Sequence, residues 1–485
     1  MVSYKKIILC LFILSTFVAC DDKWEECIAV NDQALGENVF QAIEANPELS
    51  KFSEYLVQTE YDQVLKSSKT FTVWAPTNDA LQNLDQAVLN DPEKLKVFVG
   101  NHISYQQYLT NTPLPASSRI QTLNGKYITW DKQAAKVEGA SIKQADRYAG
   151  NGVLHVVDAA MVPKMNSWEF LNGTAFGSRQ KEFMKSLEYT VFIDSLATQI
   201  GVDPATGRPV YDSIPGMVLR NRYFHEAFDI SNEDSLYTFI VLTDEAFQAE
   251  MDEYRQYYTT NTTDSTNLAT AWGVVKDLAL RGAYTPENLP DVLYSRDSVK
   301  VHIDQNAIVR TEKTSNGIVY VLNSLDVLPS DKIQPIRIEG ETAFLNRSLS
   351  LSHPEKAGSV STRRRRSESG EIFQDILAYN HDIRGFHIRY RVPNVNSTTY
   401  KVYWQALNDF NGGNTFQQKI AFKTPGASEL PYTTVEPNNY SQKMLLGEYT
   451  VDKFGYINMY LVGALSTSDA ANPLSVDYIE LVPVF

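Results

Sequence analysis

Residues 71–81 read FTVWAPTNDAL, an apolar stretch that passes through a Pro-Thr-Asn turn into an acidic segment. The same device recurs at residues 236–247, which read LYTFIVLTDEAF, with Thr243 in the place of Thr77. In the first copy Phe71 and Val73 share one face of the expected strand, and Thr72 and Trp74 share the other. This period of two predicts a strand packed on both faces. Thr77 is a good N-cap, so a helix is expected to follow directly.

A second pair of stretches repeats with nearly the same displacement. Residues 151–163 read NGVLHVVDAAMVP, and residues 316–329 read NGIVYVLNSLDVLP. In each, Asn-Gly precedes a β-rich run, and we expect Gly152 to provide a turn with positive φ. Two unlike signatures displaced by almost the same interval indicate an internal duplication whose unit has the size of a domain.

The first copy resembles the fasciclin (FAS1) family. Four motifs stand in the order that this family shows: FTVWAPTNDAL, VFVGNHISYQQY at 97–108, IQTLNGKYITW at 120–130 and NGVLHVVDAAMVP. The resemblance implies an α+β domain, with the central Asn101-His102 pair in a packed, hydrogen-bonded role. The second copy is more degenerate, with Leu242 where the family has Ala-Pro. In that copy we expect loops at 197–215 and 259–267 and a short amphipathic helix at 272–280.

From residue 333 onward the pattern changes to short alternating strands. FHIRYRV at 386–392 and YKVYWQA at 400–406 each place apolar residues on one face, which predicts an all-β sandwich. The stretches IRIEGETAF at 336–344 and LSVDYIELVPV at 474–484 resemble the first and last strands of galactose-binding-like carbohydrate-binding modules. The resemblance implies a jelly-roll sandwich that binds sugar.

The predicted fold class is therefore multidomain: two α+β fasciclin-type domains followed by an all-β jelly-roll sandwich. The expected boundaries are a lipoprotein signal peptide at 1–19, an acidic tether at 20–27, fasciclin-type domains at 28–165 and 166–332, and the sandwich at 333–485. A chain of 485 residues with 43% hydrophobic content is long enough for three such cores.

The N-terminus reads MVSYKKIILCLFILSTFVACDDKWEEC, two lysines before a short apolar run. This pattern predicts a secretory signal, and its end resembles a bacterial lipoprotein box that would acylate Cys20. The alternative is a soluble secreted protein. The acidic stretch 21–26 is similar to a tract that exports lipoproteins to the outer face of the outer membrane, or it is a solvated spacer. We therefore expect a lipid-anchored protein of the outer membrane that faces the cell exterior.

Charge and motifs exclude several classes of function. The net charge of −14 argues against nucleic acid as a partner, because phosphates would repel the chain. The seven histidines show no metal-ligand spacing, and no P-loop, dinucleotide fingerprint or GxSxG motif occurs. We expect no enzyme, no cofactor and no metal site. Asp409–Asn414 offers oxygen ligands for a calcium turn, but a β-turn explains it as well.

Candidate ligand-binding residues lie in the sandwich. Tyr403 and Trp404 are neighbours on one strand, so they face opposite ways, and Tyr403 is the better platform for a sugar ring. Phe410, Asn411 and Asn414 follow in the next loop, where stacking and amide hydrogen bonds are available.

The run Arg363–Arg366 is expected to be a mobile loop, either a docking site for an acidic surface or a protease-sensitive segment. Two functions follow for the whole chain. One is adhesion to cells or matrix through the fasciclin-type domains. The other is capture of a polysaccharide by the sandwich for uptake across the outer membrane. The expected partners are an extracellular protein or polysaccharide and the membrane that holds the lipid anchor.

Overall fold

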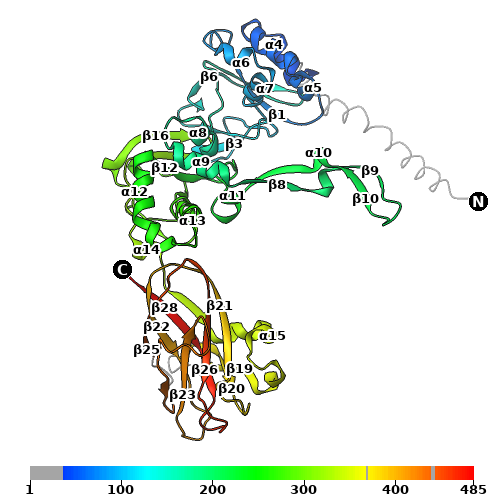
Figure 1. The fold of residues 1–485 in the computed structure, drawn as a ribbon. Coiled ribbons are helices and arrows are strands. Elements are labelled where there is room, and N and C mark those ends of the chain that lie inside the picture. Colours follow the sequence, from blue (N-terminus) through cyan, green and yellow to red (C-terminus); the bar gives the residue numbers. More distant parts are fainter. Residues whose placement is uncertain (1–35, 367–369, 439–442) are drawn as a thin grey trace, which may run out of the picture. The chain divides into compact units, whose positions relative to one another are not determined.

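The computed structural model describes residues 36–366, 370–438 and 443–485 (Figure 1). Contacts between Cα atoms divide the chain into two units. Of the described residues, the first unit holds those up to Asn166 with the short segments Asn232–Ser235 and Thr314–Asn316, and the second unit holds the others. In the described residues no helix is both long and apolar enough to cross a bilayer. Cys20 and the expected tether lie outside the described residues.

The first unit is an α+β domain built on one seven-stranded sheet of order β2-β1-β7-β6-β5-β4-β3. At its centre β1 (Phe71–Pro76) runs parallel to β7 (Gly152–Val157), and every residue of both strands is buried. Helices α3, α4, α5 and α7 contribute to the core, at Val39–Glu44, Ser50–Gln58, Tyr61–Leu65 and Pro92–Gly100. The remaining strands are β2 (Ile103–Ser104), β3 (Ser117–Gln121), β4 (Tyr127–Asp131), β5 (Lys136–Val137) and β6 (Ala140–Ala149).

Two details of the quoted signatures differ from the prediction. Thr77 accepts a hydrogen bond from the Ala80 amide as expected, but the residues after it form turns rather than a helix. Gly152 does not have a positive φ. A Cβ atom there would lie 2.1 Å from the carbonyl oxygen of Phe71. Gly152 is therefore needed because β1 and β7 approach closely, and not because of a turn.

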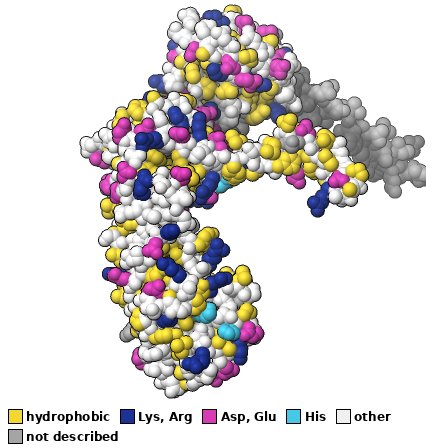
Figure 2. Space-filling view, viewed as in Figure 1, with side chains coloured by type: hydrophobic (Ala, Val, Ile, Leu, Met, Phe, Trp, Pro, Cys, Tyr) yellow, Lys and Arg dark blue, Asp and Glu magenta, His cyan; other side chains and the backbone are white. Residues whose placement is uncertain are grey.

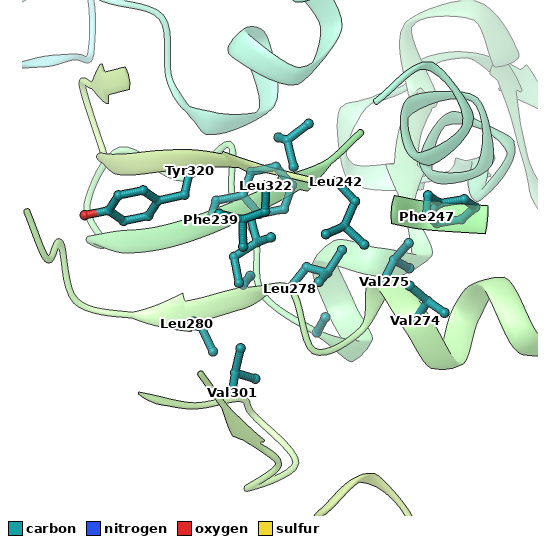
Figure 3. Packing of buried hydrophobic residues seen from close by; sticks show 14 of the residues in the cluster. Phe239, Leu242, Phe247, Val274, Val275, Leu278, Leu280, Val301, Tyr320 and Leu322 are labelled. Atoms are coloured by element: carbon teal, nitrogen blue, oxygen red, sulfur yellow. The ribbon is translucent and has the colours of Figure 1, made fainter. Parts of the chain in front are cut away.

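The second repeat has the same central pair of strands. Strand β12 (Tyr237–Leu242) runs parallel to β17 (Gly317–Leu322) in a sheet of order β13-β12-β17-β16. Here Thr243 does cap a helix, α12 (Asp244–Tyr254), by accepting from the Ala246 amide. The apolar side chains of both central strands pack against α12 and α13 (Thr263–Val275), as Figure 3 shows.

The predicted loop at 259–267 and helix at 272–280 are wrong in their bounds. Helix α13 begins at Thr263, capped by Thr262, and ends at Val275. Strand β13 (Ala279–Arg281) follows and pairs with β12, so the apolar residues that suggested an amphipathic helix belong to a helix end and a buried strand.

The insertion in the second repeat is a β-ribbon, longer than the predicted loop. In the first repeat α4 and α5 are joined by Thr59 and Glu60 alone. In the second, α9 (Ser178–Ser186) and α11 (Arg222–Glu226) are joined by β8 (Glu188–Phe192), β9 (Thr198–Val202), β10 (Pro209–Asp212) and β11 (Met217–Asn221). Strand β8 pairs with β11, and β9 pairs with β10 (Figure 1).

The C-terminal part is a β-sandwich of three sheets with orders β18-β28-β22-β25, β19-β20-β27 and β21-β26-β23-β24. Its strands are β18 (Ile336–Glu339), β19 (Val360–Arg366), β20 (Ile372–Ala378), β21 (His387–Val395), β22 (Thr399–Gln405), β23 (Phe416–Phe422), β24 (Thr433–Val435), β25 (Met444–Thr450), β26 (Gly455–Gly463), β27 (Leu474–Val476) and β28 (Tyr478–Val484). The predicted alternation is confirmed in β21 and β22, whose apolar residues fill the core.

The arginine run is not a loop. Residues Arg363–Arg366 end strand β19, which pairs antiparallel with β20. The Arg363 guanidinium lies inside the sandwich, where it binds the buried carboxylate of Asp375 and lies 3.2 Å from that of Asp409. Alternation along the strand leaves Arg364 and Arg366 exposed. Burial of one arginine is possible because two carboxylates meet it.

Candidate functional site

The Asn-His pair of the first domain has a structural role, as predicted. His102 is fully buried, its Nδ1 lies 2.9 Å from the Phe98 carbonyl oxygen, and its Nε2 accepts from the Met161 amide. Burial lowers the pKa of His102 to about 4, so the ring is neutral at physiological pH. Asn101 donates to the Met161 carbonyl. Through these hydrogen bonds Asn101 and His102 hold the segment around Met161, near the end of the domain, in place.

The second repeat replaces this pair with an ion pair that the sequence did not reveal. Leu278 takes the place of His102, because its carbonyl accepts from the amide of Ile240 as that of His102 does from Trp74. The preceding residue, Asp277, is buried and accepts from Lys332 Nζ at 2.9 Å. Burial alone would raise the pKa of Asp277, but the Lys332 charge holds it below its usual range.

The predicted ligand residues of the sandwich do not form one open platform. Tyr403 lies on the outer side of β22 with the Lys443 ammonium 4.5 Å from its ring centre, and Trp404 is buried, as alternation required. Phe410 is half-buried and packs on the sandwich core. Asn411 is buried, and its amide donates to the carbonyls of Asn414 and Ala470.

The loop from Asp409 to Asn414 is thus a turn closed by its own side chains. Asn414 donates from its amide to the Asn411 carbonyl, and Asp409 is engaged by Arg363 and Arg365. Among the described residues no cluster of three or more His, Cys, Asp or Glu side chains could hold a metal ion.

A different surface of the sandwich combines charge, aromatic rings and hollows. On sheet β21-β26-β23-β24, Arg389 stands opposite Tyr460 and Arg391 stands opposite Asn458, so all four side chains lie on the outer face. The Arg391 guanidinium lies 4.2 Å from the ring centre of exposed Tyr456. We call Arg389, Arg391, Tyr456 and Asn458 the basic face. Figure 2 shows several Lys and Arg side chains on the visible side of the sandwich.

Hollows flank the basic face on both sides. One cavity of about 360 Å³ is bordered by Arg389 and Arg391 together with Thr342, Leu349 and Ser350. Another, of about 460 Å³, is bordered by Tyr456 and Asn458 together with Lys423, Tyr449 and Lys453. Arg391 borders the first cavity and Tyr456 borders the second, and these two side chains are in contact.

The two arginines of the basic face differ in their partners from Arg337 and Arg363 of the same sandwich. Arg337 is paired with Glu339, and Arg363 with Asp375. Within the described part of the chain, neither Arg389 nor Arg391 has a carboxylate within ion-pair distance. In a chain with a net charge of −14, two guanidinium groups without a carboxylate partner on one strand make a local positively charged surface. The alternation of FHIRYRV was the available signal, since it puts both arginines outside.

Known proteins match the chain in parts. Residues 47–163 match the fasciclin domain. Human periostin is 29% identical over 138 residues, which cover 27% of this chain and 16% of periostin, so the match spans a small part of that relative. The solved FAS1 domain pair of the insect cell adhesion molecule fasciclin I covers 59% of this chain and 99% of its own, with 16% identity and a TM-score of 0.23. A β-1,3-glucan-binding family 6 carbohydrate-binding module from Bacillus halodurans covers 30% of this chain and 95% of its own, with 14% identity and a TM-score of 0.22.

The motif order, the central pair of parallel strands and the family match agree on the N-terminal part. A repeat with the same central strands follows it, and an all-β sandwich ends the chain. The chain is a multidomain protein that contains a domain of the fasciclin (FAS1) family at residues 47–163.

Proposed function

We propose that the chain is a non-catalytic cell-surface protein whose sandwich binds an acidic polysaccharide on the basic face. The observation that supports this most directly is the pair of unpaired arginines beside Tyr456. A guanidinium group binds a carboxylate or sulfate through two parallel hydrogen bonds, and an exposed tyrosine ring stacks on a pyranose. Asn458 adds an amide for sugar hydroxyls.

The ligand class follows from this chemistry. Arg389 and Arg391 lie two residues apart on one strand, about 7 Å along it, which suits successive acidic groups of an extended chain. A neutral glucan would leave both charges without a partner. The proposal therefore names uronate-rich or sulfated polysaccharides, held at the cell surface by an acylated Cys20.

One experiment tests ligand and anchor separately. Cells that express the full chain are mixed with fluorescent alginate, chondroitin sulfate and neutral laminarin, and retention on the cells is measured beside the amount of chain in the membrane fraction. The double variant Arg389→Gln/Arg391→Gln should keep its membrane fraction and lose at least tenfold of acidic glycan retention. Arg384→Gln, an exposed arginine off the strand, should change neither. Cys20→Ala should remove the chain from the membrane fraction.

Three results would contradict the proposal. If the double variant retained as much acidic glycan as the wild type, the basic face would not be the binding site. If the cells retained laminarin alone, the ligand would not be an acidic polysaccharide. If Cys20→Ala stayed in the membrane fraction, acylated Cys20 would not be what holds the chain there.

Adhesion through the fasciclin-type domains is the second candidate, and the match of residues 47–163 favours it. Both functions are compatible with one chain, because they use different domains. If no acidic or neutral glycan is retained, adhesion becomes the better account.

A further inference from the structure

The β-ribbon of the second repeat is not needed to complete the fold around it. Its base is closed by a hydrogen bond of 3.0 Å from the Arg222 amide to the Leu187 carbonyl, and the Asn221 side chain donates to the Met184 carbonyl. The first repeat makes the same helix-to-helix connection with Thr59 and Glu60 alone. Because the first repeat folds without such a ribbon, we infer that the ribbon has a role other than completing the fold.

The ribbon exposes an unusual number of apolar side chains. Phe192, Met217 and Leu219 are 45%, 48% and 63% exposed. The other exposed apolar side chains of the ribbon are Tyr189, Leu196, Ile200, Val202, Val210 and Ile214. Figure 2 shows hydrophobic side chains along the projecting ribbon. Contiguous apolar surface of this kind marks an interaction site rather than ordinary scatter.

The register of β8 and β11 gathers part of this surface on one face. Met217 stands opposite Phe192, and Leu219 stands opposite Thr190, so these four side chains point the same way. Towards the tip, Ile200 and Val202 share a face of β9, and Val202 stands opposite Pro209. A two-stranded ribbon is marginally stable in water, and burial of one face against another layer would stabilise it.

The apolar area and the charge of the ribbon indicate whether a protein chain, a membrane surface or a polysaccharide could cover it. The nine exposed apolar side chains lie on both faces of the ribbon, and the three on the face of Phe192 present on the order of 300 Å², which suits a weak, transient contact rather than the ~800 Å² per partner of a standard protein interface. The ribbon contains two arginines, Arg208 and Arg220, and four acidic residues, Glu188, Asp194, Asp203 and Asp212. Its net charge is therefore negative, and an anionic membrane surface is a poor partner. A polysaccharide would leave most of the aliphatic surface wet.

We propose that the ribbon is a self-association arm, in which the apolar face of Phe192, Met217 and Leu219 packs on the same face of a second copy of this chain. A two-fold axis makes one apolar face complementary to itself, so a single patch suffices. Two chains that each carry a net charge of −14 repel one another, and contact through the arm reduces this repulsion by keeping the rest of each chain apart. The Phe192–Met217 pair lies four residues from the base of the ribbon, about 13 Å along the strand. The bodies can therefore stay further apart than the Debye length of about 8 Å.

The test is the association state of the full chain. Sedimentation velocity of the purified wild type from 1 to 50 µM should show a monomer–dimer equilibrium. Phe192→Thr/Met217→Thr/Leu219→Thr should raise the dissociation constant at least 30-fold. A shortened variant with residues 187–221 replaced by Thr-Glu, the connection of the first repeat, should be monomeric throughout. The melting temperature of the triple variant should fall little and by no more than that of the matched control below, because its side chains are about half exposed in the monomer.

A matched control removes equally exposed apolar groups elsewhere. Val57→Thr/Val309→Thr/Leu328→Thr, at side chains 54%, 47% and 57% exposed, should dimerise as the wild type does. A wild type that stays monomeric at 50 µM, or a triple variant that dimerises with unchanged affinity, would overturn the proposal.

Cross-linking identifies what covers the arm. p-Benzoylphenylalanine at position 219 of the full chain in intact cells should give a product of twice the chain mass on illumination. A product of another mass at the expense of the dimer would overturn the second-copy assignment.

Discussion

At the scale of single residues, burial without a partner gives this chain a pH dependence. Glu250 lies in α12 and is 5% exposed, and its Oε2 atom has no hydrogen-bond partner. Burial raises the pKa of Glu250 to about 7, while Lys332 opposes the shift and Glu253 and Asp326 add to it. The protonated form is thus the one that the fold accommodates.

The sign of the effect follows from linkage. Because the folded pKa lies above the usual 4.5, the stabilisation that goes with protonated Glu250 is complete below about pH 4.5 and is lost as the pH rises through 7. Glu250→Gln should raise the free energy of unfolding by about 1–3 kcal/mol at pH 8 and have little effect at pH 5, measured by urea denaturation. Glu245→Gln, at an exposed position of the same helix that does not act on the pKa of Glu250, is the control. An equal effect of Glu250→Gln at both pH values would contradict this account.

Side chains that face the core and side chains that face outward were separable by alternation only on strands. The buried position of Trp404 and the outward position of Tyr403 were predicted correctly because a strand sends neighbours to opposite sides. Phe410 and Asn411 lie in a turn, which has no such period, and tertiary contacts decided that one packs and the other holds the loop.

At the scale of elements, the arginine run shows how a partner changes an assignment. Four consecutive arginines suggest a solvated loop, yet β19 is held in the sandwich because the Arg363 guanidinium meets Asp375 and Asp409. Burial raises the pKa of Asp375, and Arg363 opposes that shift. Neither carboxylate is near the run in sequence, so spacing could not predict the pairing.

The element should therefore depend on one arginine of the four. Arg363→Leu removes the guanidinium that hydrogen-bonds to the buried carboxylate of Asp375, and should lower the free energy of unfolding of the sandwich by about 3–5 kcal/mol. Arg364→Leu, on the exposed side of the same strand, should change it by less than about 0.5 kcal/mol. Adding Asp375→Leu to Arg363→Leu should restore much of the loss. Equal effects of the two arginine variants would show that β19 is not held in this way.

At the scale of the whole molecule, the duplication predicts separate cores. Gly152→Val places a side chain against the Phe71 carbonyl, where even a Cβ atom would lie 2.1 Å away. Differential scanning calorimetry should show the transition of the first unit lost or strongly lowered and that of the second unit unchanged. Gly358→Ala, where a Cβ atom meets nothing within 4 Å, is the control. Loss of all transitions together in Gly152→Val would mean that the two units unfold as one.

The sequence by itself determined the duplication, the two strand signatures, the alternation of the sandwich and the absence of familiar catalytic motifs, because each is a local pattern of period or spacing. Only the tertiary structure decided why Gly152 must be glycine, that Asp277 pairs with Lys332, that Arg363 pairs with Asp375, and that the insertion is a ribbon with an apolar face. Those features depend on which distant residues meet. A chain pattern records the propensity of a segment, whereas burial and charge pairing are properties of contacts that form when the segments pack.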